Sequence, residues 1–217
     1  MTCEDLPNDK PYWNYEDIGL FFLVLVFIGF VLRFLVRFHL LPRSELSNPS
    51  VFLQFLLVAS LTLALYLVLK LRHHRQVLHS LGWVWPRPVY VIVGLIAGLL
   101  LASGVALYLR YCHRSAPQIG LMELLFLAVS LGPILEESFF RGCLLPLLAQ
   151  TTGNVVAVIL IAFLFALFHQ PTSLAHWVSF TLTGAAYGWI RVVSRSTAAA
   201  TLMHATYNLV LCLSATF

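Results

Sequence analysis

The chain has 217 residues, of which 60% are hydrophobic and only 10% are charged. An ordinary soluble domain is about 45–50% apolar and about 25% charged, and the mean hydropathy of this chain is +0.88. This composition excludes a soluble globular enzyme, an intrinsically disordered chain and a nucleic-acid-binding module, because a soluble fold of this size cannot hide so much apolar surface from water. We attribute the formal net charge of +4 to Lys and Arg at membrane edges.

Seven apolar segments are predicted to span the bilayer, since a hydrocarbon core of about 30 Å requires roughly 20 apolar residues per helix. They cover residues 18–38, 51–71, 89–109, 121–149, 155–168, 174–190 and 197–213. Gly184 and Gly188 in the sixth segment have the GxxxG spacing that favours close packing of membrane helices. We therefore expect an all-α, polytopic transmembrane bundle of about seven helices, forming a single integral membrane domain over residues 1–217.

The longest predicted connection, KLRHHRQVLHSLGWVWPRP at residues 70–88, is rich in basic and aromatic side chains. Trp, Lys and Arg gather at membrane–water interfaces, where an apolar body and a polar group are both accommodated. We interpret Trp83 and Trp85 as part of such an interfacial belt. The histidines of this segment are likewise interpreted as interfacial rather than as metal ligands.

Three charged side chains interrupt the fourth predicted span, in the sequence LGPILEESFFRG. Each of Glu136, Glu137 and Arg141 costs about 2.5–3.5 kcal/mol at the centre of a membrane helix, so their presence there points to a function. Glu137 and Arg141 are spaced i and i+4 and are predicted to pair on one face, whereas Glu136 points about 100° away. The alternative interpretation is a buried ion pair with a structural role. Gly132-Pro133 predicts a kink that opens the helix beside Glu136.

His169 closes the fifth predicted span, in the sequence FLFALFHQP. The chain is predicted to turn near Thr152 and Gly153, and Glu136 and His169 lie 16 residues before and after these two positions. At 1.5 Å per residue, two antiparallel helices bring both side chains to about the same depth, roughly 24 Å from the turn. Phe165 lies one turn before His169 and is expected to pack beneath the imidazole. The alternative is an interfacial histidine without a catalytic role.

His204 and Asn208 in the seventh predicted span are spaced i and i+4, in the sequence LMHATYNLVL, and share a helix face. An unpaired amide in lipid is costly, so Asn208 is expected to point inward. His204 lies about nine residues from the preceding turn, and straight helices would leave it roughly 10 Å from the depth of Glu136 and His169. Closing that gap requires a tilted helix, a shorter sixth helix or a broken segment.

A carboxylate, two histidines and an amide inside a membrane suit the hydrolysis of a peptide bond. Glu136 is expected to take a proton from a water molecule, and His169 to orient that water or protonate the leaving amine. His204 and Asn208 are expected to donate hydrogen bonds to the oxyanion. This site needs no cofactor. Two histidines and a carboxylate also suit a three-ligand zinc site, so zinc bound by Glu136, His169 and His204 is the alternative.

The sequences EESFFR, FALFH and HATYN resemble the three motifs of the CPBP family (CAAX protease and bacteriocin-processing, also called Abi), which read EExxxR, FxxxH and HxxxN. All three motifs occur in the family order. The resemblance covers about residues 121–213, whereas the predicted helices between residues 18 and 109 carry no family motif. It implies an intramembrane endopeptidase of the glutamate-dependent type.

Carried over by motif, the resemblance makes Glu136 the water-activating base and makes Glu137 and Arg141 supporting residues, with the two histidines and Asn208 completing the site. The short chain resembles prokaryotic members, which implies an integral protein of the prokaryotic cytoplasmic (inner) membrane. The implied partners are the lipid bilayer and a peptide or membrane-protein substrate, with no nucleic acid. Two other functions stay open: a non-catalytic scaffold of the same fold that regulates a membrane partner, and a proton-coupled transporter, because intramembrane Glu and His also form proton relays.

Overall fold

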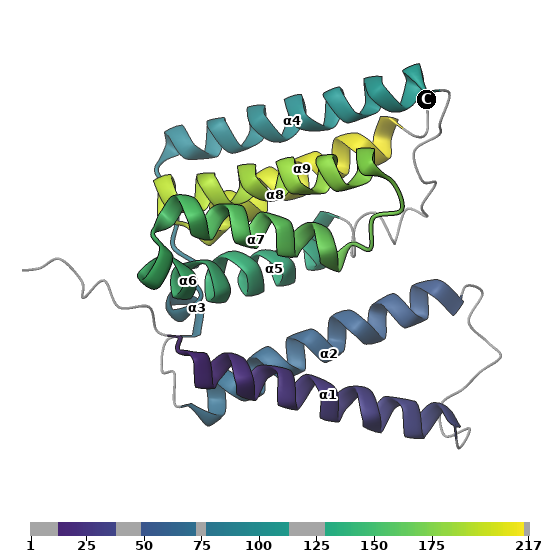
Figure 1. Cartoon of the computed structure of the whole chain (residues 1–217), viewed down its shortest axis with the longest axis vertical. Helices are drawn as coiled ribbons and strands as arrows, with labels where there is room; N and C mark the ends of the chain where they lie inside the picture. Colours follow the sequence, from purple (N-terminus) through teal and green to yellow (C-terminus); the bar gives the residue numbers. More distant parts are fainter. Residues whose placement is uncertain (1–12, 38–48, 73–76, 113–128, 215–217) are drawn as a thin grey trace, which may run out of the picture.

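The computed structural model describes residues 13–37, 49–72, 77–112 and 129–214, which form helices and short connections with no strand among them. The helices are α1 (Tyr15–Arg37), α2 (Pro49–Leu71), α3 (Val77–Ser80), α4 (Pro88–Tyr111), α5 (Gly132–Glu137), the π-helix η2 (Ser138–Leu144), α6 (Leu145–Thr152), α7 (Asn154–Phe168), α8 (Leu174–Ser194) and α9 (Thr197–Ser214). Figure 1 shows α1 and α2 as a hairpin set apart from the stacked remaining helices. The predicted all-α fold is confirmed.

The C-terminal bundle is built from close helix pairs, in which α4 packs chiefly on α9 and α7 on α8 (Figure 1). Gly98 of α4 shows how close the first pair is, because a Cβ at this position would lie only 2.5 Å from the carbonyl oxygen of Met203 in α9. Small residues allow such backbone contact between apolar helices. The packing of α4 therefore fixes the part of α9 that carries the predicted site residue His204.

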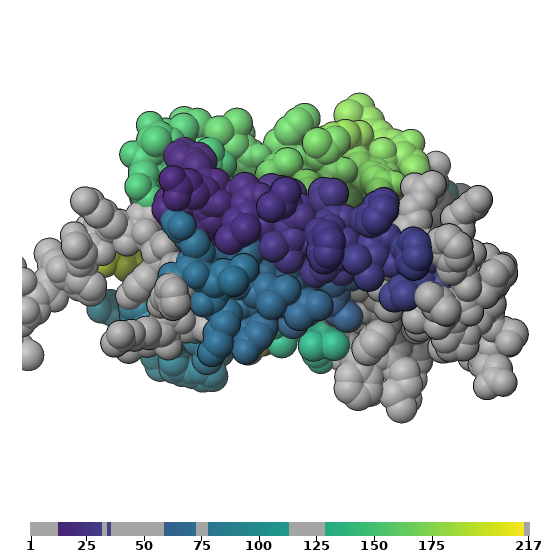
Figure 2. Space-filling view, turned by 90° about the horizontal axis from the view of Figure 1, so that it is seen from below, coloured from purple at the N-terminus to yellow at the C-terminus, as the bar shows by residue number. Residues whose placement is uncertain are grey.

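The N-terminal hairpin is closed at one end by polar contacts. Asn14 and Asp17 exchange two hydrogen bonds of 2.9 Å at the start of α1, each backbone N–H donating to the other side chain. Arg72, just beyond α2, donates from Nε to Oδ1 of Asp17 over 2.6 Å, and this hydrogen bond raises the pKa of Arg72. Phe21 stacks on Phe139 of η2 with ring centroids 4.7 Å apart. Figure 2 shows α1 and α2 covering one face of the molecule.

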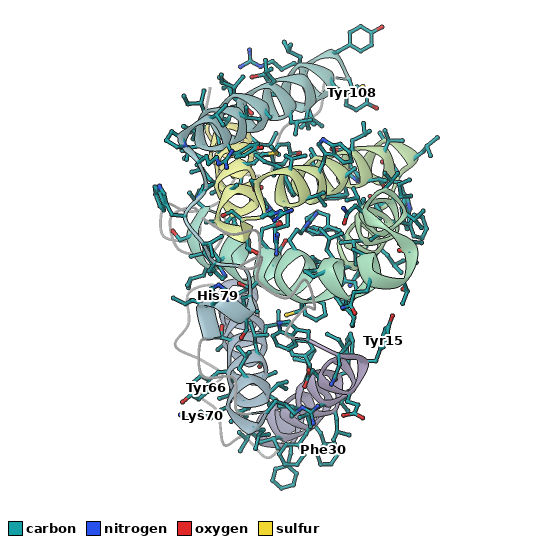
Figure 3. The ribbon with its side chains drawn as sticks, turned by 90° about the vertical axis from the view of Figure 1, so that its left-hand side faces the viewer. Tyr15, Phe30, Tyr66, Lys70, His79 and Tyr108 are labelled. Carbon is teal, nitrogen blue, oxygen red and sulfur yellow. The ribbon has the colours of Figure 1, made fainter. Side chains whose placement is uncertain are left out.

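The outer faces of the helices are apolar. Phe27 and Phe30 of α1 and Leu100 and Leu107 of α4 are each more than 60% exposed, and Figure 3 shows Phe30 pointing away from the hairpin. Among the described residues, α4 is the helix that is long and apolar enough to cross a membrane, with a mean hydropathy of 2.4. The predicted count of seven spans stays a prediction.

Local sequence explains where the helices near the site begin and end. Gly153, with a positive φ of 77°, separates α6 from α7, a backbone conformation that favours glycine. This confirms the turn predicted near Thr152 and Gly153. Ser173 caps α8 by accepting a hydrogen bond from the backbone N–H of His176. Pro88 stands in the first turn of α4, where no backbone donor is needed.

The fourth predicted span, residues 121–149, is not one regular helix. Its residues 121–128 lie outside the described part of the chain, and the remainder consists of the π-helical residues 129–131, α5, the π-helix η2 and α6. Gly132 and Pro133 are the first residues of α5, and the kink predicted there stays a prediction. A π-helix bonds residue i to i+5, so its turns hold more residues than α-helical turns and it is often found at functional sites. The wider turns begin at the residue that follows the two carboxylates.

The connection predicted as an interfacial belt contains one exposed and one half-buried tryptophan, and its place at a membrane interface stays a prediction. Trp85 is 86% exposed, as an interfacial residue would be. Trp83, however, is half-buried and donates from Nε1 to the hydroxyl of Ser138 in η2 over 2.9 Å. The indole N–H needs a buried acceptor once it leaves water, and the irregular helix supplies one. The segment after α3 therefore packs into the bundle instead of lying along its surface.

Candidate active site

A fully buried carboxylate, Glu137, lies at the end of α5. Its Oε1 atom accepts hydrogen bonds from Nη1 of Arg141 at 3.0 Å and from Nδ1 of His204 at 2.9 Å. The i,i+4 pair predicted between Glu137 and Arg141 is confirmed. Charge-assisted hydrogen bonds of this kind are stronger than neutral ones. They join η2 and α5 to α9.

The guanidinium of Arg141 is held by a backbone carbonyl and by aromatic rings, although its Nε atom has no hydrogen-bond partner among the described residues. Nη2 donates to the carbonyl of Gly184 in α8 at 2.7 Å, and the Cζ atom lies 4.7 Å from the ring centroid of Phe165 and 5.4 Å from that of Tyr187. Cation–π contacts of this type are favourable when water is excluded. Gly184 allows the approach, because a Cβ there would lie 3.2 Å from Cα of Ala162 in α7. The close packing predicted from GxxxG is thereby confirmed at this position.

The second carboxylate, Glu136, has a different environment. Its side chain is 33% exposed, against 0% for Glu137, and its Oε2 atom lies 3.7 Å from Nε2 of His169. This confirms that helical depth brings Glu136 and His169 together. The separation is too long for a direct hydrogen bond, and Oε2 has no hydrogen-bond partner among the described residues. The two side chains are therefore close without a direct hydrogen bond, and the Oε2 atom itself is buried although the Glu136 side chain as a whole is partly exposed.

His169 caps the end of α7 and is oriented by its neighbours. Its Nδ1 atom lies 2.8 Å from the carbonyl oxygen of Phe165, and because a carbonyl only accepts, Nδ1 carries the proton. In the neutral imidazole this leaves Nε2 as an acceptor directed at Glu136. The ring stacks on Phe180 of α8 at 4.5 Å and contacts the ring of Phe165 at 4.3 Å, so the predicted packing of Phe165 against His169 is confirmed.

Helix α9 supplies His204 and, one turn further along, the partly buried Asn208. The His204 ring stacks on Tyr187 with centroids 4.6 Å apart, and it forms a T-shaped contact with Phe165 with centroids 5.9 Å apart. Phe165 thus contacts both histidines of the site. The expected mismatch of depth does not keep His204 away from the carboxylates, because its Nδ1 atom lies 2.9 Å from Oε1 of Glu137.

The structure therefore sorts the predicted site residues into two carboxylate–histidine pairs. Glu136 faces His169, and Glu137 binds His204. For the zinc alternative, Glu136, His169 and His204 would have to converge on one ion, and the described residues include no group of three His, Cys, Asp or Glu side chains so arranged. The catalytic roles assigned to these residues stay predictions.

Several residues that shape the site were missed in the sequence. Tyr187 and Phe180 of α8 stack on the two histidines, and Trp83 bonds to the hydroxyl next to the carboxylates. Aromatic residues in an apolar chain carry no periodic signal that separates a site wall from a lipid-facing side chain. Only Gly184 had a usable pattern, through its GxxxG spacing with Gly188.

Comparison with known proteins identifies the segment that holds these pairs. Residues 118–210 match the family model described as type II CAAX prenyl endopeptidase Rce1-like. No curated protein and no solved structure gave a match. The matched segment contains Glu136, Glu137, Arg141, His169, His204 and Asn208. The part of the chain that carries both carboxylate–histidine pairs is thus similar to the Rce1-like endopeptidase domain, which is consistent with a protease of the CPBP family.

Proposed function

We propose that this protein is an intramembrane endopeptidase in which Glu136 activates the hydrolytic water without a metal ion. The family supports intramembrane endopeptidase activity in general. The observation that carries the finer proposal is the pair of Glu136 and His169, whose Oε2 and Nε2 atoms lie 3.7 Å apart without a direct hydrogen bond. An ionised carboxylate and a neutral imidazole protonated at Nδ1 both present acceptors at this gap. A water molecule has two hydrogens and bridges two such acceptors.

The chemistry follows from that placement. Glu136 takes one proton from the water, and the resulting hydroxide forms a bond to the carbonyl carbon of the substrate peptide. The carbonyl electron pair moves to oxygen and gives a tetrahedral oxyanion. When the intermediate collapses, the C–N bond breaks and the proton held by Glu136 passes to the leaving nitrogen. His169 keeps the water in place throughout.

The oxyanion is proposed to be held from α9. The Asn208 amide is a donor, and His204 donates from Nε2 when it carries a proton on both ring nitrogens. The carboxylate of Glu137, 2.9 Å from Nδ1, orients the His204 ring. Donors placed where negative charge develops are each worth about 2.7–4 kcal/mol of transition-state stabilisation.

The substrate and location are part of the same proposal. We propose that the helices form one integral membrane domain in the prokaryotic inner membrane, and that the substrate is a peptide or a segment of a membrane protein. The exposed apolar faces of α1 and α4 support a lipid environment. The Glu136 side chain is one third exposed, which supports access by an extended peptide.

The test is cleavage of a library of internally quenched peptides by the purified protein in detergent. Wild type is compared with Glu136→Gln and with Glu16→Gln, which removes a largely exposed carboxylate of the N-terminal hairpin. We expect Glu136→Gln to lower kcat at least about 100-fold, the size of a general-base contribution, and Glu16→Gln to have no effect. Cleavage should persist in a strong zinc chelator.

Full activity of Glu136→Gln would overturn the proposal. Loss of activity in the chelator, with recovery on adding zinc, would replace the activated-water mechanism with the metal alternative. Ion flux in liposomes without peptide cleavage would instead favour the transporter. A membrane-partner function that survives substitution of Glu136, His169, His204 and Asn208 would favour the scaffold.

A further inference from the structure

The segment that follows α3 is fixed to the bundle by its backbone. The carbonyl of Leu81 accepts from Oγ1 of Thr197 at 2.6 Å, and the carbonyl of Gly82 accepts from the backbone N–H of Thr197 at 2.9 Å. On the other side, Gly142 of η2 is so near that a Cβ there would lie 2.7 Å from the Leu81 oxygen. Residues 81–83 are therefore held between the start of α9 and the π-helix.

This anchored segment directs one side chain at the turn that carries the carboxylates. Trp83 donates from Nε1 to Oγ of Ser138 at 2.9 Å, and the same hydroxyl donates to the carbonyl of Ile134 at 2.6 Å. The indole is a donor only, so the hydroxyl must accept from it and turn its own proton toward Ile134. The result is a hydrogen-bond chain with a fixed direction.

The two ends of that chain bracket Glu136 and Glu137. Ile134 and Ser138 are separated by one helical turn, and the bond between them closes the turn in which both carboxylates lie. A serine that bonds back to the residue four positions earlier bends a helix locally. Here the bond lies at the change from α5 to η2.

The two carboxylates depend on this turn to different degrees. Glu137 accepts two hydrogen bonds, from Arg141 and His204, which fix its side chain even if the backbone of the turn shifts. The Oε2 atom of Glu136 has no hydrogen bond from a described residue, so its aim at His169 is set by the backbone that carries it. A misplacement of 1 Å at a reacting group costs about 100-fold in rate.

We propose that Trp83 is a positioning residue for Glu136, acting through the hydroxyl of Ser138. This inference rests on the function proposed above. It assigns a catalytic consequence to a residue outside the matched domain at 118–210, and it links the first half of the chain to the reacting carboxylate.

The test compares kcat and KM of Trp83→Phe, Ser138→Ala and the double variant on the peptide that wild type cleaves best. Trp83→Phe keeps an aromatic ring and removes the N–H, and Trp85→Phe is the matched control at an 86% exposed position. We expect each single variant to lower kcat about tenfold with KM unchanged. The double variant should lose no more than either single variant, since both break one chain. Trp85→Phe should keep wild-type kcat.

Thermal melting separates positioning from folding. A fall in kcat with an unchanged melting temperature supports positioning, and Ser138→Ala serves if Trp83→Phe does not fold. Wild-type kcat in both single variants, or losses that multiply in the double variant, would overturn the inference. Glu136→Gln is measured in the same assay. If it is inactive, a normal Trp83→Phe refutes only the role of Trp83, whereas an active Glu136→Gln refutes the proposed function itself.

Discussion

Two neighbouring carboxylates of this protein occupy opposite environments. Glu137 is fully buried and accepts two hydrogen bonds of 2.9–3.0 Å, whereas Glu136 is one third exposed and stands 3.7 Å from its nearest histidine. The Oε1 atom of Glu137 is held by an arginine and a histidine, although its Oε2 atom has no hydrogen-bond partner among the described residues. A buried ion pair of this kind contributes to structure, whereas a carboxylate that is partly exposed in a cleft is a candidate for reactivity. Successive side chains on a helix point about 100° apart. Two consecutive glutamates can therefore have different roles, one stabilising the fold and the other reacting with the substrate.

The largest effect on the free energy of unfolding is expected from removing Arg141, the cation of the buried pair with Glu137. Arg141→Met keeps much of the side-chain volume but leaves the Glu137 carboxylate with His204 as its remaining donor. Breaking a buried pair by removing one partner costs about 3–5 kcal/mol. We expect a loss of that size in the free energy of unfolding in detergent, and Glu136→Gln should change it by less than about 1 kcal/mol.

The matched control for this prediction is Arg87→Met, at an exposed arginine before α4. It should leave the free energy of unfolding nearly unchanged. If Arg141→Met is as stable as Arg87→Met, the buried network contributes nothing to stability, and the contrast between the two carboxylates fails.

The parts of this contrast that the sequence predicted are those set within one helix or one hairpin. The pairing of Glu137 with Arg141 follows from i,i+4 spacing, and the meeting of Glu136 with His169 follows from equal distances to one turn. Both depend on geometry that neighbouring residues impose on each other, and the family motifs lie on these same residues.

The contacts that the sequence did not predict depend on packing between distant segments. The bond from His204 to Glu137 involves the π-helix and the position of α9 against α4, which no local spacing specifies. The bond from Trp83 to Ser138 joins residues 55 positions apart. The composition around Trp83 predicts an interfacial residue and gives no sign that its N–H donates to a hydroxyl inside the protein.

A smaller effect should distinguish the two histidines. His204→Leu removes a donor from the fully buried Glu137 carboxylate, and leaving a buried acceptor short of a partner costs about 1–3 kcal/mol. His169→Leu removes a ring that has no direct hydrogen bond to Glu136, and we expect the free energy of unfolding to fall by less than about 1 kcal/mol. Both variants should lose peptidase activity. Unfolding in detergent measures the difference, and equal losses for the two variants would contradict a division between structural and reactive pairs.

The smallest effect is expected at Tyr187, whose ring stacks on His204 while its buried hydroxyl has no hydrogen-bond partner among the described residues. Tyr187→Phe keeps the stacked ring and removes a hydroxyl whose burial is unfavourable without a partner. We therefore expect the free energy of unfolding to stay the same or to rise by up to about 1 kcal/mol, with kcat unchanged. Tyr66→Phe, at an exposed position, is the control. A loss of stability larger than that of the control would show that the Tyr187 hydroxyl is hydrogen-bonded within the buried network, because removing a hydroxyl lowers stability when it breaks a hydrogen bond.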